Sequence, residues 1–328
     1  MISGIRSKIS FELGRNPRIA ARPESTRKYV PREFDCVLLI SADFELAWAW
    51  RYAIGKQGSL PDPLQFARQA RQNIPLILDL CDTYRIPITW GTVGHLFLDS
   101  CRRSEKGMAH ASLSRLPYFR NEWWAYESGD WFDADPCSSL ESDNAWYAPD
   151  LIEKILASRA GHEIGCHTFS HIDCSDAICP EKVIVDELKQ CQEAAAKFGV
   201  RLESFIFPGH TMGNFEAIKK CGFTSVRTNY LNEIGYPVKD EFGLWRFPAS
   251  AEMIRKPAWS LSYNLYRYRK MVERATRNKA VLNLWFHPSM PTADAPGLFE
   301  GIFRAIRQTG KKCWVTTMRE YRMWLDEQ

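Results

Sequence analysis

Short apolar runs alternate along the chain with segments whose apolar residues recur every three or four positions. A continuous apolar run over 36–41 is typical of a strand buried on both faces. Residues 62–83 have apolar spacing near 3.6, which predicts a helix. Further strands are expected at 86–93, 162–167, 204–207, 223–227, 281–286 and 313–317, and further helices at 149–160, 180–198, 213–221, 299–308 and the C-terminal end.

This alternation predicts an α/β fold with a parallel sheet. Strands that alternate with helices pair in parallel through right-handed crossovers. About seven such units favour a single barrel over two domains. An open doubly wound sheet is the alternative, but no GxGxxG or GxxxxGK[ST] follows any strand, which argues against nucleotide-binding versions of it.

Residues 1–32 differ in pattern from the barrel domain expected at 33–328. They are rich in Arg and Lys, poor in acids and without clear periodicity. Such a segment is expected to be a mobile arm or to pack across the domain, with contact to an anionic partner or a membrane surface as the alternative.

Residues 101–148 interrupt the alternation of strands and helices. They combine tryptophans and tyrosines with acidic residues, and a long insertion between barrel elements is usually functional. Aromatic faces interleaved with acids suit stacking on sugar rings. Most of these rings are expected to pack the insertion onto the barrel, whereas Trp124 and Trp131 are expected to face a substrate over the site.

Composition narrows the class of protein without naming a function. The chain has 328 residues, 45% hydrophobic and 25% charged, which is typical of a globular protein. A net charge of +4 gives no reason to expect a nucleic-acid partner. Ten cysteines in a chain of this length, and the lack of a secretory leader pattern, predict reduced thiols and a cytoplasmic protein. A basic stretch at 255–279 is expected to be a solvated helix face, with contact to phosphates or a membrane as the alternative.

His167 and His171 are the strongest chemical signal. They stand four residues apart directly after an expected strand, at the rim where barrel active sites lie. Two imidazoles at this spacing can converge on one divalent cation, zinc being a common choice. His162, at the start of the same strand, is expected to be structural.

Carboxylates and a further histidine follow two other strands. Asp43 and Glu45 come after the first strand, and alternation points both to the same side. One carboxylate can bind a metal while the other takes a proton, although one could instead cap a helix expected at 46–52. His287 ends the strand at 281–286 and is either a buried core residue or a general acid.

Together these segments resemble the polysaccharide deacetylase family, also called the NodB-homology or carbohydrate esterase family four group. The resemblance covers roughly residues 35–320 and rests most firmly on HTFSH, the H-[S/T]-x-x-H motif of the family. SADFE corresponds to its first motif and the Leu-x-x-His pattern ending at His287 to its fifth. FIFPGH and LWRFP correspond more weakly to the third and fourth.

The resemblance implies a distorted (β/α)7, TIM-like barrel and metal-dependent removal of N-acetyl groups from amino sugars. It implies that His167 and His171 bind the metal with Glu45, that Asp43 is the general base and that His287 is the general acid. The resemblance leaves open whether Asp43 or Glu45 binds the metal and which of the two is the general base. Zinc is the expected metal, with cobalt, nickel or manganese as alternatives.

Two features of the family pattern have no counterpart in the sequence. The arginine that pairs with the base in the third motif is replaced by apolar residues at 206–208, and His210, which follows, is expected to contact substrate. The acid that orients His287 is not identified, with Asp240, Glu241 and Glu252 as candidates.

The leading hypothesis is an N-deacetylase in surface-polysaccharide assembly, for example of lipopolysaccharide, O-antigen or capsule. A cytoplasmic enzyme, or one at the inner face of the membrane, would act on a nucleotide-linked or lipid-linked N-acetylated saccharide. A deformylase or another small-amide hydrolase on the same fold is the second hypothesis. A carbohydrate-binding relative without catalytic activity is the third.

Overall fold

Strand β2 (Cys36–Phe44) pairs with three neighbours in a ten-stranded sheet. The computed structural model describes residues 17–55, 62–230, 233–308 and 313–328. All neighbouring strands of this sheet run parallel except β10 and β11. On one side of β2 the order is β3 (Thr89–Thr92), β6 (Glu163–Cys166), β7 (Ser204–Ile206), β8 (Ser225–Tyr230), β11 (Trp245–Ala249) and β10 (Val238–Lys239). On the other side lie β13 (Val281–Phe286) and β12 (Ala251–Glu252), and β14 (Cys313–Thr316) pairs with the first half of β2.

The sheet curls into a half barrel that stays open. Only Ser250 separates β11 from β12, and its N–H donates to the Asn283 carbonyl on β13 at 2.7 Å, which brings the two ends of the sheet together. No ladder between β11 and β13 completes the ring within the described residues. The expected α/β class and barrel-like sheet are confirmed, and the barrel is open, not closed.

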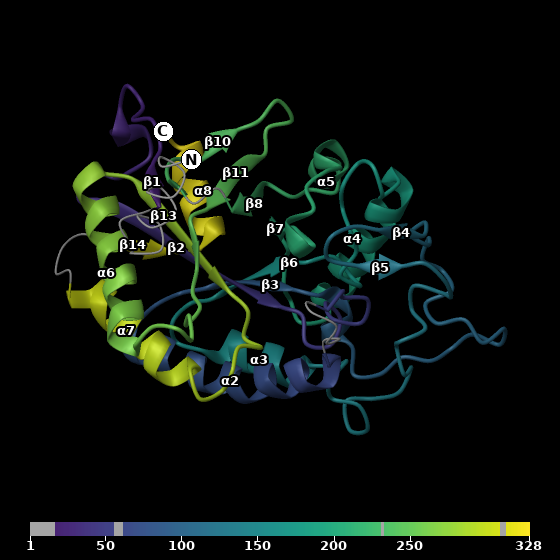
Figure 1. Cartoon of the computed structure of the whole chain (residues 1–328). Coiled ribbons are helices and arrows are strands. Elements are labelled where there is room, and N and C mark those ends of the chain that lie inside the picture. The colour runs from purple at the N-terminus through teal and green to yellow at the C-terminus, as the bar shows by residue number, and fades with distance from the viewer. Residues whose placement is uncertain (1–16, 56–61, 231–232, 309–312) are drawn as a thin grey trace, which may run out of the picture.

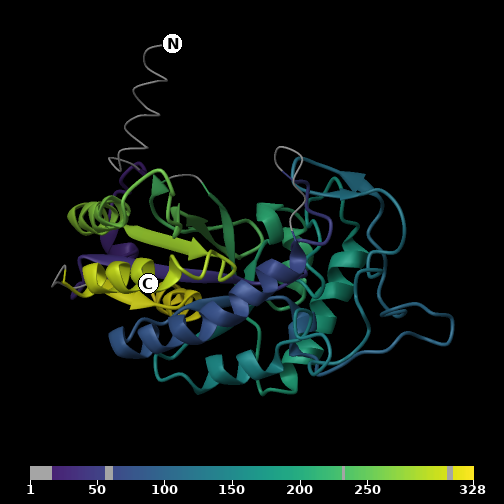
Figure 2. The same cartoon turned by 60° about the horizontal axis from the view of Figure 1, so that its bottom comes forward.

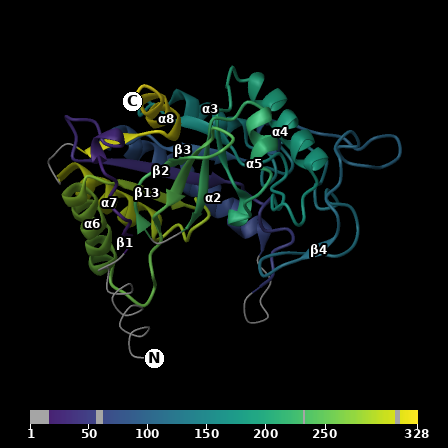
Figure 3. The ribbon, with the colours of Figure 1, turned by 90° about the horizontal axis from the view of Figure 1, so that it is seen from above.

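Helices cover the outside of the curled sheet. Helices α6, α7 and α2 pack one against the next, and α4 and α5 lie near β6 and β7 (Figures 1 and 3). Asp62 caps α2 through its side chain, which accepts the N–H of Leu64, and Pro63 opens the helix. The helices are α2 (Pro63–Tyr84), α3 (Pro149–Ala157), α4 (Glu181–Ala196), α5 (Phe215–Lys220), α6 (Leu261–Asn278), α7 (Ala295–Gln308) and α8 (Met318–Asp326).

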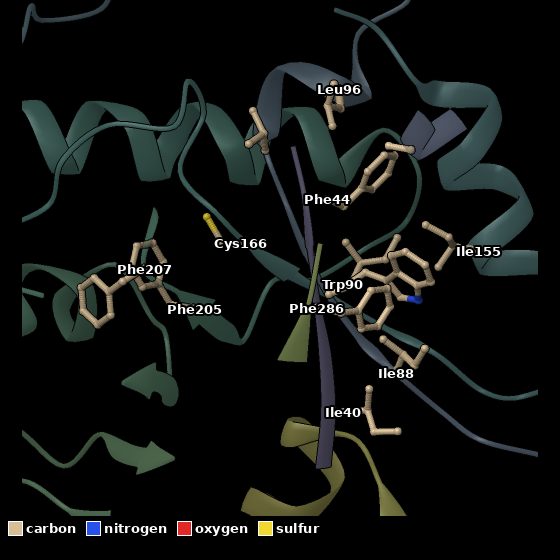
Figure 4. Packing of buried hydrophobic residues seen from close by; sticks show 14 of the residues in the cluster. Ile40, Phe44, Ile88, Trp90, Leu96, Ile155, Cys166, Phe205, Phe207 and Phe286 are labelled. Atoms are coloured by element: carbon tan, nitrogen blue, oxygen red, sulfur yellow. The ribbon is translucent and has the colours of Figure 1, made fainter. Parts of the chain in front are cut away.

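Side-chain alternation along β2 separates two cores and prepares the site. Ile40 and Phe44 pack outward under the helices with Trp90 and Phe286 (Figure 4). The ring of Trp90 lies 6.1 Å from the ring of Phe44 and 6.1 Å from that of Phe286. Val37 and Leu39 belong to a second cluster with Tyr321 and Leu325 of α8. Because successive side chains alternate, Ser41 and Asp43 share the face of Val37 and Leu39, nearer the carboxyl end of the strand.

The insertion and the N-terminal segment are mostly irregular. The chain from 101 to 148 forms loops beside the carboxyl ends of β2 and β3 (Figures 1 and 2), with only the short pair β4 (Phe119–Arg120) and β5 (Ala125–Tyr126). Strand β1 (Arg18–Ile19) pairs with β9 (Glu233–Ile234), and Val30 is fully buried. Residues 17–32 therefore pack on the domain, and the remainder of the basic arm expected at 1–32 lies outside the described residues.

Residues 46–52 form successive turns instead of the expected helix. Leu46 has a left-handed φ of 46°, and the bonds Trp48 N–H to Glu45 O and Trp50 N–H to Ala47 O span three residues. The N–H of Ala47 donates to Ala145 O in the insertion, so a tertiary contact replaces a helical one. None of the helices in the described residues is long and apolar enough to cross a membrane.

Candidate active site

Polar side chains from four segments of the chain, each within a strand or directly after one, meet inside the curled sheet. β2 supplies Asp43 and, one residue beyond its end, Glu45, and β8 supplies Arg227. His167 follows β6 directly and His287 follows β13. The carboxyl ends of parallel strands lie at one rim, so residues far apart in sequence meet there.

Glu45 faces both histidines of the HTFSH segment. Its Oε2 lies 3.3 Å from His167 Nε2 and 3.2 Å from His171 Nε2. Thr168 and His171 have left-handed φ angles of 58° and 56°, which turn the segment back so that both rings reach one carboxylate. All three side chains are at most 4% exposed.

The arrangement of these three residues fits a divalent cation. His167 Nδ1 lies 2.8 Å from the Ile206 carbonyl, which can only accept, so Nδ1 carries the hydrogen and the Nε2 lone pair faces Glu45. Neither His167 Nε2 nor Glu45 Oε1 has a hydrogen-bond partner among the described residues, although both are buried. Two imidazole nitrogens and a carboxylate are a donor set typical of catalytic zinc and related metals.

Arg227 holds Asp43 through two parallel contacts. Its Nη1 and Nη2 donate to Asp43 Oδ1 at 2.6 Å and Oδ2 at 2.8 Å, and Nη1 also donates to Ser41 Oγ at 3.0 Å. The expectation that Asp43 has no arginine partner is therefore wrong: the arginine comes from β8 and not from the segment at 205–210. Arg227 ends the strand expected at 223–227, but Thr224 and Ser225 leave no apolar pattern there that would have marked it as a site residue.

His287 lies between the two carboxylates and a third acid. Its Nε2 is 3.6 Å from Glu45 Oε1 and 3.9 Å from Asp43 Oδ2, and its Nδ1 is 3.4 Å from Glu252 Oε1. Of the three acids considered for orienting His287, Glu252 is the one beside it. Asp240 instead accepts from Arg246 Nε at 2.9 Å.

Burial and charge set the protonation of the site. Burial alone would raise the pKa of Glu45, but the charge of His287 lowers it. Burial also opposes ionisation of Asp43, yet Arg227 holds its pKa well below the usual range. Burial would lower the pKa of His287, but Glu45, Glu252 and Asp43 raise it to about 9. Both carboxylates are therefore ionised at neutral pH, and His287 carries a proton that it can donate.

The residues expected to contact substrate lie at different depths. The ring of Trp124 meets the ring of His171 edge to face at 5.4 Å. The Trp124 ring also packs closely on Gly209, where an added Cβ would lie only 2.4 Å from it. The ring of His210 packs edge to face on Trp285 at 4.8 Å. Burial and, to a smaller extent, the charge of Arg227 lower the pKa of His210 to about 4.

Trp131 has no free ring face for a sugar. It is 2% exposed, stacks on Tyr52 at 4.9 Å, lies under the Arg51 guanidinium and donates from Nε1 to Ser170 Oγ at 2.9 Å. The ring therefore packs the insertion onto the barrel, which corrects the expectation of substrate contact. Trp123 and Tyr118 are the exposed aromatic residues of the insertion, at 48% and 60%.

Comparison with solved structures defines the fold class. Chains described as polysaccharide deacetylases from Mycobacterium smegmatis and Pseudomonas aeruginosa PAO1 both superimpose with a TM-score of 0.62, at 16% and 12% identity. The alignments cover 95% and 93% of this chain and 96% and 95% of those chains. PuuE allantoinase superimposes with a TM-score of 0.61 at 12% identity, over 92% of this chain and 93% of that one. At these identities the likeness shows the fold alone.

The family model for polysaccharide deacetylases matches residues 64–226, which include the HTFSH segment and reach β8. This match confirms the resemblance to the polysaccharide deacetylase family that the motifs predicted. No curated protein matches the chain.

Proposed function

We propose that this protein is a metal-dependent N-deacetylase of an amino sugar. The observation that carries the proposal is the division of labour between two neighbouring carboxylates. Asp43 has both oxygens on Arg227, whereas Glu45 faces the unpartnered Nε2 of His167. This difference supports Glu45, His167 and His171 as metal ligands and leaves Asp43 available for proton transfer.

Each remaining residue has a chemical role in amide hydrolysis. A divalent cation held by the three ligands supplies a Lewis acid for the scissile carbonyl. Asp43 accepts a proton from the water whose oxygen attacks the acetyl carbon, and Arg227 keeps that carboxylate ionised and oriented. His287 donates its proton to the nitrogen as the C–N bond breaks, which releases acetate and a free amine. Glu252 positions His287 through Nδ1.

The substrate that we propose is an N-acetylated saccharide carried on a nucleotide or a lipid in surface-polysaccharide assembly. A cytoplasmic location or one at the inner face of the membrane accompanies this proposal. The basic stretch around α6 supports an anionic carrier only in part, because Arg269 and Lys270 pair with Glu273 and Arg267 is 5% exposed over Trp259. The exposed rings of the insertion support binding of a sugar.

A panel of substrates tests this proposal. Purified protein is supplied with Zn²⁺, Co²⁺, Ni²⁺ or Mn²⁺, and acetate release is measured from free, nucleotide-linked and polyprenyl-phosphate-linked N-acetylated sugars. We expect acetate from at least one linked sugar, and both activity and metal content should fall in His167→Ala but not in Glu241→Gln, at an exposed acid. Full activity in metal-free His167→Ala would disprove the proposed chemistry.

Two other outcomes separate the alternatives on the same fold. The likeness to PuuE allantoinase favours including cyclic amides in the panel, together with N-formyl sugars. Formate release or opening of a cyclic amide, without acetate release, would identify a small-amide hydrolase. Metal-loaded protein that binds sugars and hydrolyses none of the panel would identify a carbohydrate-binding relative.

A further inference from the structure

A second group of metal-binding residue types lies behind the HTFSH segment. His95 belongs to the 3-10 turn Gly94–Phe97 that follows β3, and Cys101, His110 and Asp135 belong to the insertion. One ligand atom from each of the four lies within 4.8 Å of all the others. None of these residues takes part in the deacetylase site described above.

The donor atoms gather around one oxygen of Asp135. Its Oδ2 lies 3.1 Å from His95 Nε2, 2.8 Å from His110 Nε2 and 3.3 Å from Cys101 Sγ. Ligands bound to zinc at about 2.0–2.3 Å with tetrahedral angles lie about 3.3–3.7 Å apart. The short distances to Oδ2 would therefore lengthen slightly, and the other distances between donor atoms are at most 4.8 Å. Asp135 and His95 have no exposed side-chain surface, and the His110 side chain is 12% exposed.

The contact between His95 and Asp135 needs a positive charge between the two side chains. His95 Nδ1 lies 3.1 Å from the Trp146 carbonyl, so Nδ1 carries the hydrogen and Nε2 presents a lone pair. Nε2 is buried and has no hydrogen-bond partner among the described residues. A neutral imidazole lone pair that faces a carboxylate oxygen repels it, and a metal cation bound to both atoms would remove this repulsion.

The cluster also has the supporting hydrogen bonds of a built metal site. The other oxygen of Asp135, Oδ1, accepts the N–H of Cys137 at 2.9 Å and the hydroxyl of Tyr147 at 3.4 Å, which leaves Oδ2 directed at the histidines. Such bonds to the remote atoms of ligands fix ligand orientation in metal sites. The same hydroxyl also lies 3.3 Å from Cys101 Sγ.

We propose that His95, Cys101, His110 and Asp135 form a second, structural metal site that binds a zinc ion. A donor set of one sulfur, two nitrogens and one oxygen fits tetrahedral zinc, and four protein ligands leave no position open for catalysis. Binding deprotonates the Cys101 thiol and releases that proton to solvent, so the thiolate and the carboxylate balance the charge of the ion.

This metal would tie the insertion to the wall of the active site. The ring of Phe169, which lies between His167 and His171 in sequence, packs edge to face on His95 at 5.6 Å and on His110 at 5.2 Å. The ring of His95 also lies 4.4 Å from that of Trp48, three residues after Glu45. The second site therefore packs against the segments that carry Glu45, His167 and His171, and it shares no residue with the proposed catalytic metal site.

Cobalt substitution distinguishes the two sites because only one of them contains sulfur. Apo protein kept reduced and loaded with Co²⁺ should show a thiolate-to-cobalt charge-transfer band in the near ultraviolet, and this band should persist in His167→Ala. Glu45, His167 and His171 offer only nitrogen and oxygen, so cobalt there gives no such band. The result is independent of deacetylase activity, and its failure leaves the proposed function untouched.

Variants and metal analysis complete the test. Cys101→Ala should lose the band and one metal equivalent per chain, whereas Cys221→Ala, at another half-buried cysteine, should keep both. If Cys101→Ala does not fold, the comparison of the native protein with His167→Ala still decides. Native protein that binds cobalt without a thiolate band, or Cys101→Ala with unchanged zinc content, would show that the cluster is only a hydrogen-bonded network and overturn the proposal.

Discussion

Asp43 and Glu45 stand two residues apart in one segment, and their neighbours give them different chemistry. Arg227 occupies both oxygens of Asp43 at 2.6 and 2.8 Å, a planar two-point contact that fixes the rotation of the carboxylate. Glu45 pairs with no arginine among the residues that the structure describes, and it faces imidazoles. The chemistry of each acid therefore depends on residues contributed by other strands.

Replacing Arg227 with lysine should impair catalysis more than folding. Lysine keeps the charge but cannot hold both oxygens, so the proposed base loses its orientation. We expect kcat to fall about 100-fold with a smaller change in KM, given the size of typical general-base contributions. Steady-state kinetics on an active substrate measure this, with Arg246→Lys as a control because Arg246 pairs with Asp240 outside the site. Native kcat in Arg227→Lys would mean that the Asp43 carboxylate needs no such support.

Glu252 should matter only when the leaving group needs a proton. Its Oε1 lies 3.4 Å from His287 Nδ1, and this acid was one of three that the sequence could not rank. Glu252→Gln should lower kcat for amide hydrolysis about 10-fold to 100-fold and leave hydrolysis of an activated aryl acetate nearly unchanged, since that leaving group departs unprotonated. Parallel assays of both substrates, with Glu241→Gln as the control, separate positioning from general damage. Equal losses on both substrates would contradict the role.

The sequence predicted most of the residues that meet at the candidate site because they lie at or directly after apolar runs. Alternation on β2 was enough to place Asp43 on the interior face, and the spacing of His167 and His171 was enough to pair them. Arg227 and Glu252 were missed or unranked because their importance comes from the curl of the sheet, which brings β8 and β12 opposite β2. No local pattern encodes that approach.

At the scale of elements, the loop that carries His287 depends on helix α2. Asn73 is buried on this helix, and its Nδ2 donates to the carbonyls of Pro288 at 2.7 Å and Met290 at 2.8 Å. These two bonds fix the chain directly after β13. The position of the proposed acid thus depends on an amide more than 200 residues earlier in sequence.

Asn73→Leu keeps the side-chain volume and removes both bonds. Two buried carbonyls lose their donor, so we expect the free energy of unfolding to fall by about 2 kcal/mol. Urea unfolding measures this loss, and Gln65→Leu, at an exposed position of the same helix, should stay within about 0.5 kcal/mol of the native value. A native-like stability of Asn73→Leu would show that water replaces the amide, in which case the loop does not depend on α2.

Elements were predicted best where one periodicity dominates. Strand β13 was expected at 281–286 and is Val281–Phe286, and α2 differs from its expected range by one residue at each end. The helix expected at 46–52 failed because the insertion takes the N–H of Ala47. Strand β11 was not expected, because Pro248 within it argues against a strand, whereas the parallel pairing with β8 stabilises one there.

At the scale of the whole molecule, buried titratable groups make opposing contributions to the pH dependence of stability. Burial raises the pKa of Glu163 and Glu187, so these acids contribute stability that is complete below about 4.5 and lost as the pH rises through their folded values. His162 acts in the other direction. Burial lowers its pKa to about 4, with Asp82 opposing the shift, and its Nδ1 accepts the N–H of Ile88 at 3.0 Å.

Since the folded pKa of His162 lies below the unfolded value of 6.5, its contribution is complete above pH 6.5 and is lost as the pH falls to about 4. This loss amounts to about 2–3 kcal/mol across the window. His162→Gln can still accept from Ile88 but does not titrate, so its stability should fall less than that of the native protein between pH 7.5 and pH 4.5. Urea unfolding of both proteins at several pH values measures the difference, in which the shared contributions of Glu163 and Glu187 cancel. Parallel stability curves would show that His162 titrates normally and that other groups cause any acid sensitivity.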